Sequence, residues 1–248
     1  MKIRRLLCLS FITLALHVCG LQAEDKAAAI KAVEPEVQTA KWAVKWWQPR
    51  HEQKLADKKE QGRVDLLMIG DSITHGWEGA GKPVWEKYYA KRHAFNIGFS
   101  GDRTEQVLWR IDHGEVDDIT PRLAVIMIGT NNTGHRQDAP EHTAAGIQAI
   151  VDRLHKKLPK TKVLLLGIFP RGATPSDKLR KINDAINQRI SKLADDKQVF
   201  YLDINETFLG DDGNLPKSIM PDLLHPNRKG YEMWAEAMEG KIAQLMGE

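Results

Sequence analysis

The chain has 248 residues, of which 42% are apolar and 28% are charged, so it is long enough to bury one sizeable hydrophobic core. This composition excludes a disordered or fibrous polymer and makes one globular domain the simplest expectation. The formal net charge of +3 gives no indication of a surface that binds nucleic acid.

Residues 1–23 have the pattern of a signal peptide: basic residues, a mostly apolar run, and then Ala23 before two acidic residues. A membrane anchor is the alternative, but His17 interrupts an apolar run that is short of the ~20 residues a spanning helix needs. Lipid attachment at Cys19 is a second alternative, which the bulky Val18 disfavours. We therefore expect an exported protein, periplasmic or secreted, without stable membrane insertion after cleavage.

Cleavage would change the chemistry available to the chain. Both cysteines, Cys8 and Cys19, lie in the leader, so the mature chain would have no thiol for a disulfide, a nucleophile or a metal site. The leader also holds three basic residues, which leaves 33 basic and 33 acidic residues. No nucleic-acid partner is therefore expected.

Residues 24–61 predict a helical extension before the main domain, rich in Ala, Lys, Glu and Gln. Trp42, Trp46 and Trp47 have the spacing of one face of a short helix. Such a face more often packs against the domain than stays exposed, although a carbohydrate-stacking platform or an oligomer contact is the sharper alternative.

Residues 62–248 alternate between short apolar runs and amphipathic stretches, which predicts parallel strands joined by helices in one catalytic domain. The strands are expected at 64–69, 94–97, 123–128, 163–168 and 199–202. The helices are expected near 84–91, 104–111, 141–158, 176–194 and 228–246. The fold class is thus α/β, a three-layer α/β/α sandwich around a mostly parallel sheet of about five strands.

Three of these strands end in turns that carry polar or glycine residues, where a parallel sheet places its ligand site. Gly70-Asp71-Ser72 follows the first strand, Gly101 lies in the turn after the second, and Asn131 follows the third. A strand-end serine can act as a nucleophile, and Gly101 can aim an N–H at a ligand. Asn131 can donate to an oxyanion. Each feature alone is also an ordinary turn.

Near the end of the chain, Asp222 precedes His225 by three residues, just before the last predicted helix. A carboxylate at this spacing can accept the Nδ1 proton of the imidazole, which leaves Nε2 free to accept a serine proton. Most Asp-x-x-His pairs are surface turns. The competing histidines His75, His113 and His135 lack an acidic residue at the same spacing.

These four blocks, in this order, resemble the sequence blocks of the SGNH (GDSL-type) hydrolase superfamily, and the resemblance covers about residues 62–246. Val107-Leu108-Trp109-Arg110, Gly129 to Asn132 with Gly134-His135, and Pro170-Arg171-Gly172 are similar to the branch that contains the catalytic subunits of platelet-activating-factor acetylhydrolase. The resemblance implies a flavodoxin-like fold and a serine esterase.

The chemistry that the resemblance implies uses Ser72 as nucleophile, His225 as base and Asp222 as its partner. The oxyanion hole would comprise the amides of Ser72 and Gly101 and the side chain of Asn131. This route requires no metal ion and no organic cofactor. Activity is expected to fall as acid pH protonates the histidine.

The resemblance also implies a substrate class, which is a small ester or an acetylated carbohydrate. The small and polar residues around Ser72 favour acetyl over long acyl groups. His135 and Arg171 are candidate substrate contacts, although ordinary salt bridges or hydrogen bonds explain them equally well. The likeness to dimer-forming relatives allows a homodimer. Two alternatives remain open: an acyltransferase that passes acetyl groups between sugars, and a non-catalytic carbohydrate-binding domain.

Overall fold

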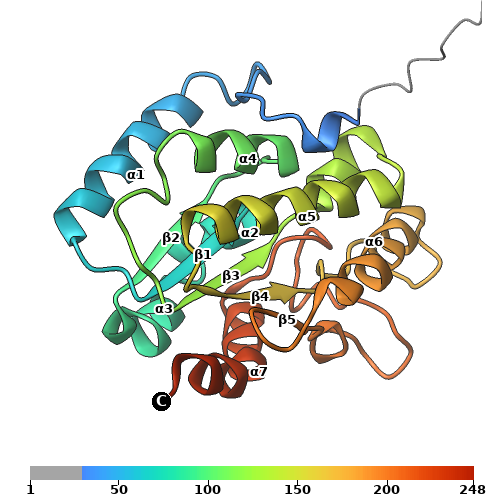
Figure 1. Cartoon of the computed structure of the whole chain (residues 1–248). Coiled ribbons are helices and arrows are strands. Elements are labelled where there is room, and N and C mark those ends of the chain that lie inside the picture. Colours follow the sequence, from blue (N-terminus) through green and yellow to red (C-terminus); the bar gives the residue numbers. More distant parts are fainter. Residues whose placement is uncertain (1–29) are drawn as a thin grey trace, which may run out of the picture.

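The computed structural model describes residues 30–248, so the predicted signal peptide and both cysteines lie outside the described residues. A five-stranded parallel sheet in the order β2-β1-β3-β4-β5 runs through the centre, with helices on both faces (Figure 1). The strands are β1 (Leu66–Gly70), β2 (Ala94–Gly98), β3 (Leu123–Met127), β4 (Lys162–Leu166) and β5 (Val199–Leu202).

At least one helix lies between each pair of successive strands, as crossover connections between parallel strands require. They are α1 (Trp47–Gln61), α2 (Ser72–His75), α3 (Lys82–Tyr88), α4 (Thr104–Asp112), α5 (Pro140–Lys157), α6 (Lys178–Ile190) and α7 (Arg228–Met246). Shorter turns of helix are η1 (Lys31–Val33), η2 (Gly76–Glu78), η3 (Ala90–Arg92), η4 (Asn132–Arg136), η5 (Ser191–Leu193) and η6 (Asn205–Phe208). Every predicted strand and helix of the main domain overlaps an observed one, and the expected α/β/α fold is confirmed.

Alternate side chains of each strand supply two separate cores, because successive residues of a strand point to opposite faces. Leu67 and Ile69 of β1 pack with residues of α4, α5 and α6 on one face. Leu66 and Met68 pack with residues of α3 and α7 on the other. Both faces are buried, so the strands read as continuous apolar runs and not as an alternation.

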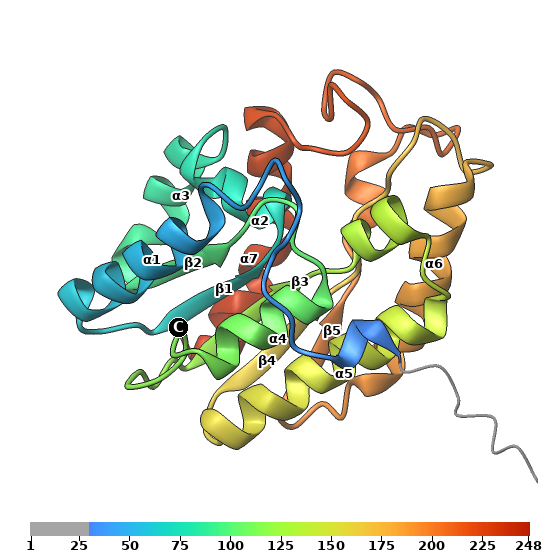
Figure 2. The ribbon, with the colours of Figure 1, turned by 90° about the horizontal axis from the view of Figure 1, so that it is seen from above.

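The segment before the sheet differs from the expected helical extension. Residues 41–46 form hydrogen-bonded turns, and α1 begins only at Trp47. We name residues 34–46 the strap. Figure 2 shows the strap crossing over α4 toward α2 and the end of β2. The prediction of a short helix through all three tryptophans is therefore wrong, because its turns do not continue as one regular helix.

No helix within residues 30–248 is long and apolar enough to cross a membrane.

Candidate active site

The predicted site residues meet at the carboxyl edge of the sheet, where the strand order reverses. β1 lies between β2 and β3, so the chain leaves β1 toward β2 on one side and later returns to β3 on the other. Ser72 begins α2 directly after β1, Gly101 follows β2, and Asn131 follows β3. Ligand sites of doubly wound parallel sheets form at such a switch point.

The turn that carries Ser72 is held by close backbone packing. A β-carbon at Gly70 would clash with the Thr74 side chain, so a glycine is needed for α2 to start directly at the strand end. Asp71 caps α2 by accepting a 3.0 Å hydrogen bond from the Ile73 N–H. The Tyr231 hydroxyl of α7 donates to the Ile73 carbonyl at 2.6 Å, which ties the last helix to this turn.

Ser72 and His225 lie 153 positions apart in sequence, yet the Ser72 Oγ is 2.8 Å from the His225 Nε2. His225 Nδ1 lies 2.6 Å from one carboxylate oxygen of Asp222, and the other oxygen accepts the His225 backbone N–H at 2.7 Å. The structure thus brings together the three residues that the sequence predicts, in the order hydroxyl, imidazole, carboxylate. This arrangement lets a serine lose its proton to a histidine.

The two carboxylates near the serine have opposite electrostatic environments. Burial favours protonation of Asp222, but hydrogen bonds from the His225 ring and from backbone N–H groups outweigh it and lower the Asp222 pKa. Burial raises the pKa of Asp71 from 3.8 to about 6, and the Ile73 N–H bond only partly opposes this shift. Asp222 therefore keeps its negative charge to a lower pH than Asp71 does.

The other side of the serine is formed by the predicted oxyanion donors. Gly101 has φ +80°, a left-handed conformation that favours glycine. The Asn131 side-chain amide donates to the Asp102 carbonyl at 2.9 Å, which holds the amide against the Gly101 turn. Because an amide nitrogen carries two hydrogens, one remains for a ligand.

A buried charge network, which sequence reasoning missed, holds the Gly101 turn in place through the neighbouring residue Asp102. The Asp102 carboxylate accepts from the Trp47 indole N–H at 2.6 Å and from Arg110 Nε at 2.8 Å. Arg110 also donates to Glu115, and His51 Nδ1 lies 3.1 Å from the same carboxyl group. The sequence signal for it was Arg110, a charge beside Val107, Leu108 and Ile111 on the buried side of α4.

Burial raises the pKa of Asp102 above its ordinary value of 3.8, and Arg110 and the Trp47 N–H oppose that shift. The carboxyl group is fully buried, so it depends on these partners for the hydrogen bonds that water would otherwise provide. The network therefore couples α1 to the conformation of the residue next to Gly101.

The remaining candidates take up different positions. Arg171 donates to the Thr130 carbonyl at 2.7 Å and lines a cavity of about 400 Å³ together with Asp222. His135 is exposed on η4. Among the competing histidines, His113 stacks on Trp109 with ring centroids 3.7 Å apart.

The third competitor, His75, forms a second serine–histidine pair near the same edge. Its Nδ1 lies 3.0 Å from the Ser100 hydroxyl oxygen. Its nearest carboxylate contact, from Nε2 to Glu78, is 3.9 Å long. This pair therefore lacks the short carboxylate contact that orients His225.

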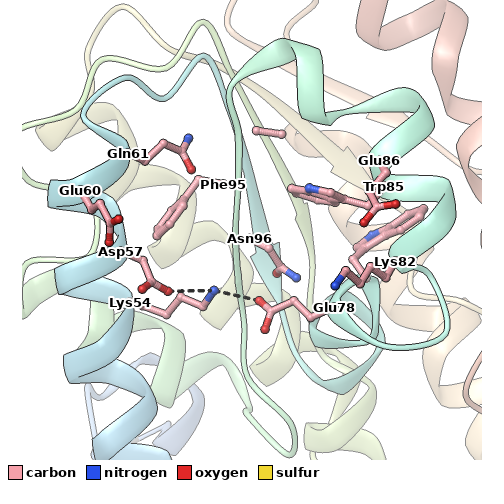
Figure 3. Close-up of a pocket in the computed structure, with 12 residues that line it drawn as sticks. Lys54, Asp57, Glu60, Gln61, Glu78, Lys82, Trp85, Glu86, Phe95 and Asn96 are labelled. Atoms are coloured by element: carbon pink, nitrogen blue, oxygen red, sulfur yellow. Dashed lines mark ion pairs between the residues drawn. The ribbon is translucent and has the colours of Figure 1, made fainter.

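A second cavity, a groove of about 700 Å³, lies between α1 and α3 beside the edge strand β2 (Figure 3). Charged side chains line it, and Lys54 forms ion pairs there with Asp57 at 3.7 Å and with Glu78 at 2.9 Å. None of Ser72, Asp222 and His225 lines this groove. The groove is therefore separate from the site of the serine chemistry, although it is larger than the cavity beside Asp222. Within residues 30–248, no group of three His, Cys, Asp or Glu side chains is placed to hold a metal ion.

Comparison with known proteins places the chain among esterases. The model of the GDSL-like lipase/acylhydrolase family matches residues 68–233. The human platelet-activating factor acetylhydrolase IB subunit alpha1 is 33% identical over 206 residues, which cover 82% of this chain and 85% of that protein.

Two solved structures share the fold. A GDSL-like lipase from Bacteroides thetaiotaomicron superposes with a TM-score of 0.64 at 22% identity, over 79% of this chain and 97% of that one. An acetylxylan esterase from Geobacillus stearothermophilus gives 0.56 at 19% identity, over 75% and 94%. With a family model that spans most of its length and a relative at 33% identity, the chain belongs to the GDSL-like lipase/acylhydrolase family.

Proposed function

We propose that this chain is an exported serine esterase that hydrolyses short-chain esters, above all acetyl esters of carbohydrates or of other small alcohols. The observation that carries the proposal is the 2.8 Å contact between Ser72 Oγ and His225 Nε2, with Asp222 2.6 Å from the opposite ring nitrogen. This is the geometry of an activated nucleophile, its base and the group that orients the base.

In the first half of the reaction, Ser72 Oγ attacks the ester carbonyl carbon while His225 Nε2 takes the hydroxyl proton. The Asp222 carboxylate accepts from Nδ1 and stabilises the imidazolium. The new C–O bond makes the carbon tetrahedral and leaves a negative charge on the former carbonyl oxygen. The backbone N–H groups of Ser72 and Gly101 and the second amide hydrogen of Asn131 would donate to that oxygen.

Collapse of this intermediate breaks the bond to the alcohol, and His225 gives its proton to the departing oxygen. A water molecule then attacks the acyl-serine, and His225 takes the proton of that water and returns it to Ser72 Oγ as the acid leaves. One ester and one water thus become one alcohol and one acid. These steps need no group beyond the side chains and backbone amides named above.

The substrate class rests on similarity and on the leader. The human relative is named an acetylhydrolase, and one structural neighbour is an acetylxylan esterase, so acetyl transfer to water is the chemistry that their names share. The predicted signal peptide at 1–23 favours an exported enzyme that meets extracellular or periplasmic esters. Arg171, which lines the cavity beside Asp222, is the polar side chain placed to contact them.

The test compares two serines that each contact a histidine. We expect Ser72→Ala to lower kcat for p-nitrophenyl acetate by at least about 10³-fold, because the nucleophile is lost. Ser100→Ala removes the hydroxyl 3.0 Å from His75 and should stay within about tenfold of the wild type, a difference of ~1.4 kcal/mol in the barrier. Wild-type turnover in Ser72→Ala, or loss of turnover in Ser100→Ala alone, would contradict the assignment.

A further inference from the structure

Trp42 lies at the surface, directly over a proposed oxyanion donor. The residue is 55% exposed, although it is one of the largest apolar side chains in the strap. A β-carbon at Gly101 would clash with the Trp42 indole, so the ring rests on the α-carbon of Gly101. The outer edge of the six-membered ring thus contacts the turn after β2, and much of the indole remains open to solvent.

Trp46 extends this surface toward the serine turn. Its ring centroid is 6.2 Å from that of Trp42, with the two planes inclined by 35°. It is also 6.2 Å from the ring of His75, the last residue of the helix that Ser72 begins. Trp42 and Trp46, which we call the aromatic shelf, therefore lie beside both the Gly101 turn and the helix that carries the serine.

The strap that carries the shelf is fastened at several points, so the position of the rings is defined by the fold. The Gln38 side chain donates to the Gly101 carbonyl at 3.4 Å, and the Glu36 N–H donates to the Glu105 carbonyl at 3.1 Å. At the other end, Trp47 is buried and bound to Asp102. A ring held this firmly loses little side-chain freedom when it contacts a ligand.

We propose that the aromatic shelf binds a pyranose ring of the ester's alcohol, which makes Trp42 a specificity-determining residue for acetylated carbohydrates. This inference rests on the proposed function. An ester whose carbonyl oxygen lies against the Gly101 N–H has its alcohol bonded to the same carbon, so the alcohol begins close to the Gly101 turn on which Trp42 lies, whereas an acetyl group is too short to cover the indole. A pyranose has an apolar C–H face that matches an exposed indole and a rim of hydroxyls that stays in water.

The surroundings of the shelf favour a sugar over a lipid surface. Lys41 and Lys45, which flank the two rings in sequence, are exposed and charged. Val37 and Val44 of the same strap are also large apolar side chains that are exposed. The two lysines interrupt this apolar sequence. Membrane binding requires a continuous apolar surface, whereas stacking on one sugar requires only a ring.

The first experiment compares two esters. We expect Trp42→Ala to lower the ratio of kcat/KM for methyl tri-O-acetyl-β-xylopyranoside to kcat/KM for ethyl acetate by about five- to tenfold, mainly through KM for the sugar ester. Trp42→Phe should recover part of that ratio, because it keeps a smaller ring. Val44→Ala, which removes a 47% exposed apolar side chain from the same strap, should leave the ratio unchanged.

The outcomes separate the possible roles of Trp42. If the indole only shaped the Gly101 turn, kcat would fall for both esters alike and the ratio would not change, which would overturn the inference. Loss of binding to phosphatidylcholine vesicles in Trp42→Ala, with an unchanged ratio, would also overturn it in favour of a lipid contact.

A binding measurement makes the result independent of turnover. We expect isothermal titration calorimetry to give a Kd for xylotriose that is about five- to tenfold higher for the double variant with Ser72→Ala and Trp42→Ala than for Ser72→Ala alone. An equal Kd in both proteins would overturn the inference even if the esterase assignment stands. Absence of any esterase activity in the wild type, with Trp42-dependent xylotriose binding, would instead refute the proposed function and leave the sugar site in place.

Discussion

The residues nearest the serine are positioned by local backbone geometry as much as by distant packing. Leu223, between Asp222 and His225, has φ +61°, a left-handed conformation that is rare for a branched side chain. It curls the chain so that both the side chain and the N–H of His225 reach Asp222. The Gly172 N–H donates to the Leu223 carbonyl at 3.0 Å and helps to hold this conformation.

The side-chain amide of Asn131 has two roles. One of its hydrogens bonds to the Asp102 carbonyl, and the other is proposed to stabilise the oxyanion. We expect Asn131→Ala to lower kcat for p-nitrophenyl acetate by ~10²–10³-fold. The free energy of unfolding, measured by urea titration, should fall by only about 1–2 kcal/mol.

The matched control for this prediction is Asn187→Ala. Asn187 is as buried as Asn131, and its amide also donates to a backbone carbonyl, that of Ile168 at 2.9 Å. Its side-chain oxygen also accepts the Ile168 N–H at 2.8 Å, so Asn187→Ala should lose at least as much stability and yet keep kcat near that of the wild type. Similar kcat losses in both variants would show that Asn131 acts through the fold and not on the oxyanion.

At the scale of elements, α1 is the support of the oxyanion turn. Its first residue, Trp47, binds Asp102, and Lys58 near its end donates to the carbonyls of Gly114 and Asp117 at 2.6 and 2.5 Å. These contacts fasten both ends of α1 to the segment from β2 to the loop after α4. The expectation that a tryptophan face packs on the domain is therefore met by Trp47, which is 1% exposed, and not by Trp42.

This role makes the indole N–H of Trp47 important for stability. Trp47→Phe keeps an aromatic ring but leaves the buried Asp102 carboxylate without one of its donors, so we expect a loss of about 1–3 kcal/mol in the free energy of unfolding. Denaturant unfolding followed by circular dichroism provides the measurement.

Trp109→Phe is the control for Trp47→Phe, because Trp109 packs on the Trp47 ring at 5.3 Å without a hydrogen bond to Asp102. It should be destabilised less than Trp47→Phe. Equal losses in the two variants would mean that ring packing, and not the hydrogen bond to Asp102, accounts for the effect.

The stability of the whole molecule depends on titratable groups around the site that are partly or fully buried. Burial, assisted by the charge of Arg50, lowers the pKa of His75 from 6.5 to about 4. Between these two pH values the unfolded chain binds a proton at this position and the folded protein does not, so His75 makes the fold less stable as the pH falls from 6.5 toward 4. Asp71 and Asp102, whose pKa values are raised by burial, act in the opposite direction.

These contributions oppose one another, so the pH dependence of unfolding of the wild type alone does not reveal the effect of His75. The difference in the free energy of unfolding between the wild type and His75→Gln isolates that effect. Glutamine does not titrate and can still bond to Ser100. Relative to the wild type, we expect the variant to gain about 1–3 kcal/mol in the free energy of unfolding when the pH is lowered from 7 to 4. Urea titrations at both pH values test this, and a difference that does not change with pH would refute the assignment.

The amino-acid pattern by itself determined the architecture and most of the candidate site. Short apolar runs that alternate with amphipathic stretches favour a parallel sheet covered on both faces, and such a sheet gathers its strand-end residues at one edge. The positions of Ser72, Gly101 and Asn131 directly after three strands therefore predict that these residues lie together. Asp222 and His225 were paired by spacing alone, since a contact over three residues is local.

The tertiary structure decided what depends on contacts between distant residues. Spacing predicts that Trp42, Trp46 and Trp47 share one face. Only the packing of this segment on the domain determines that Trp47 is buried against Asp102, whereas Trp42 contacts Gly101 and stays exposed. The charge network with Arg110 was hidden for the same reason: its partners come from three separate segments, and no local pattern records which buried charges will meet.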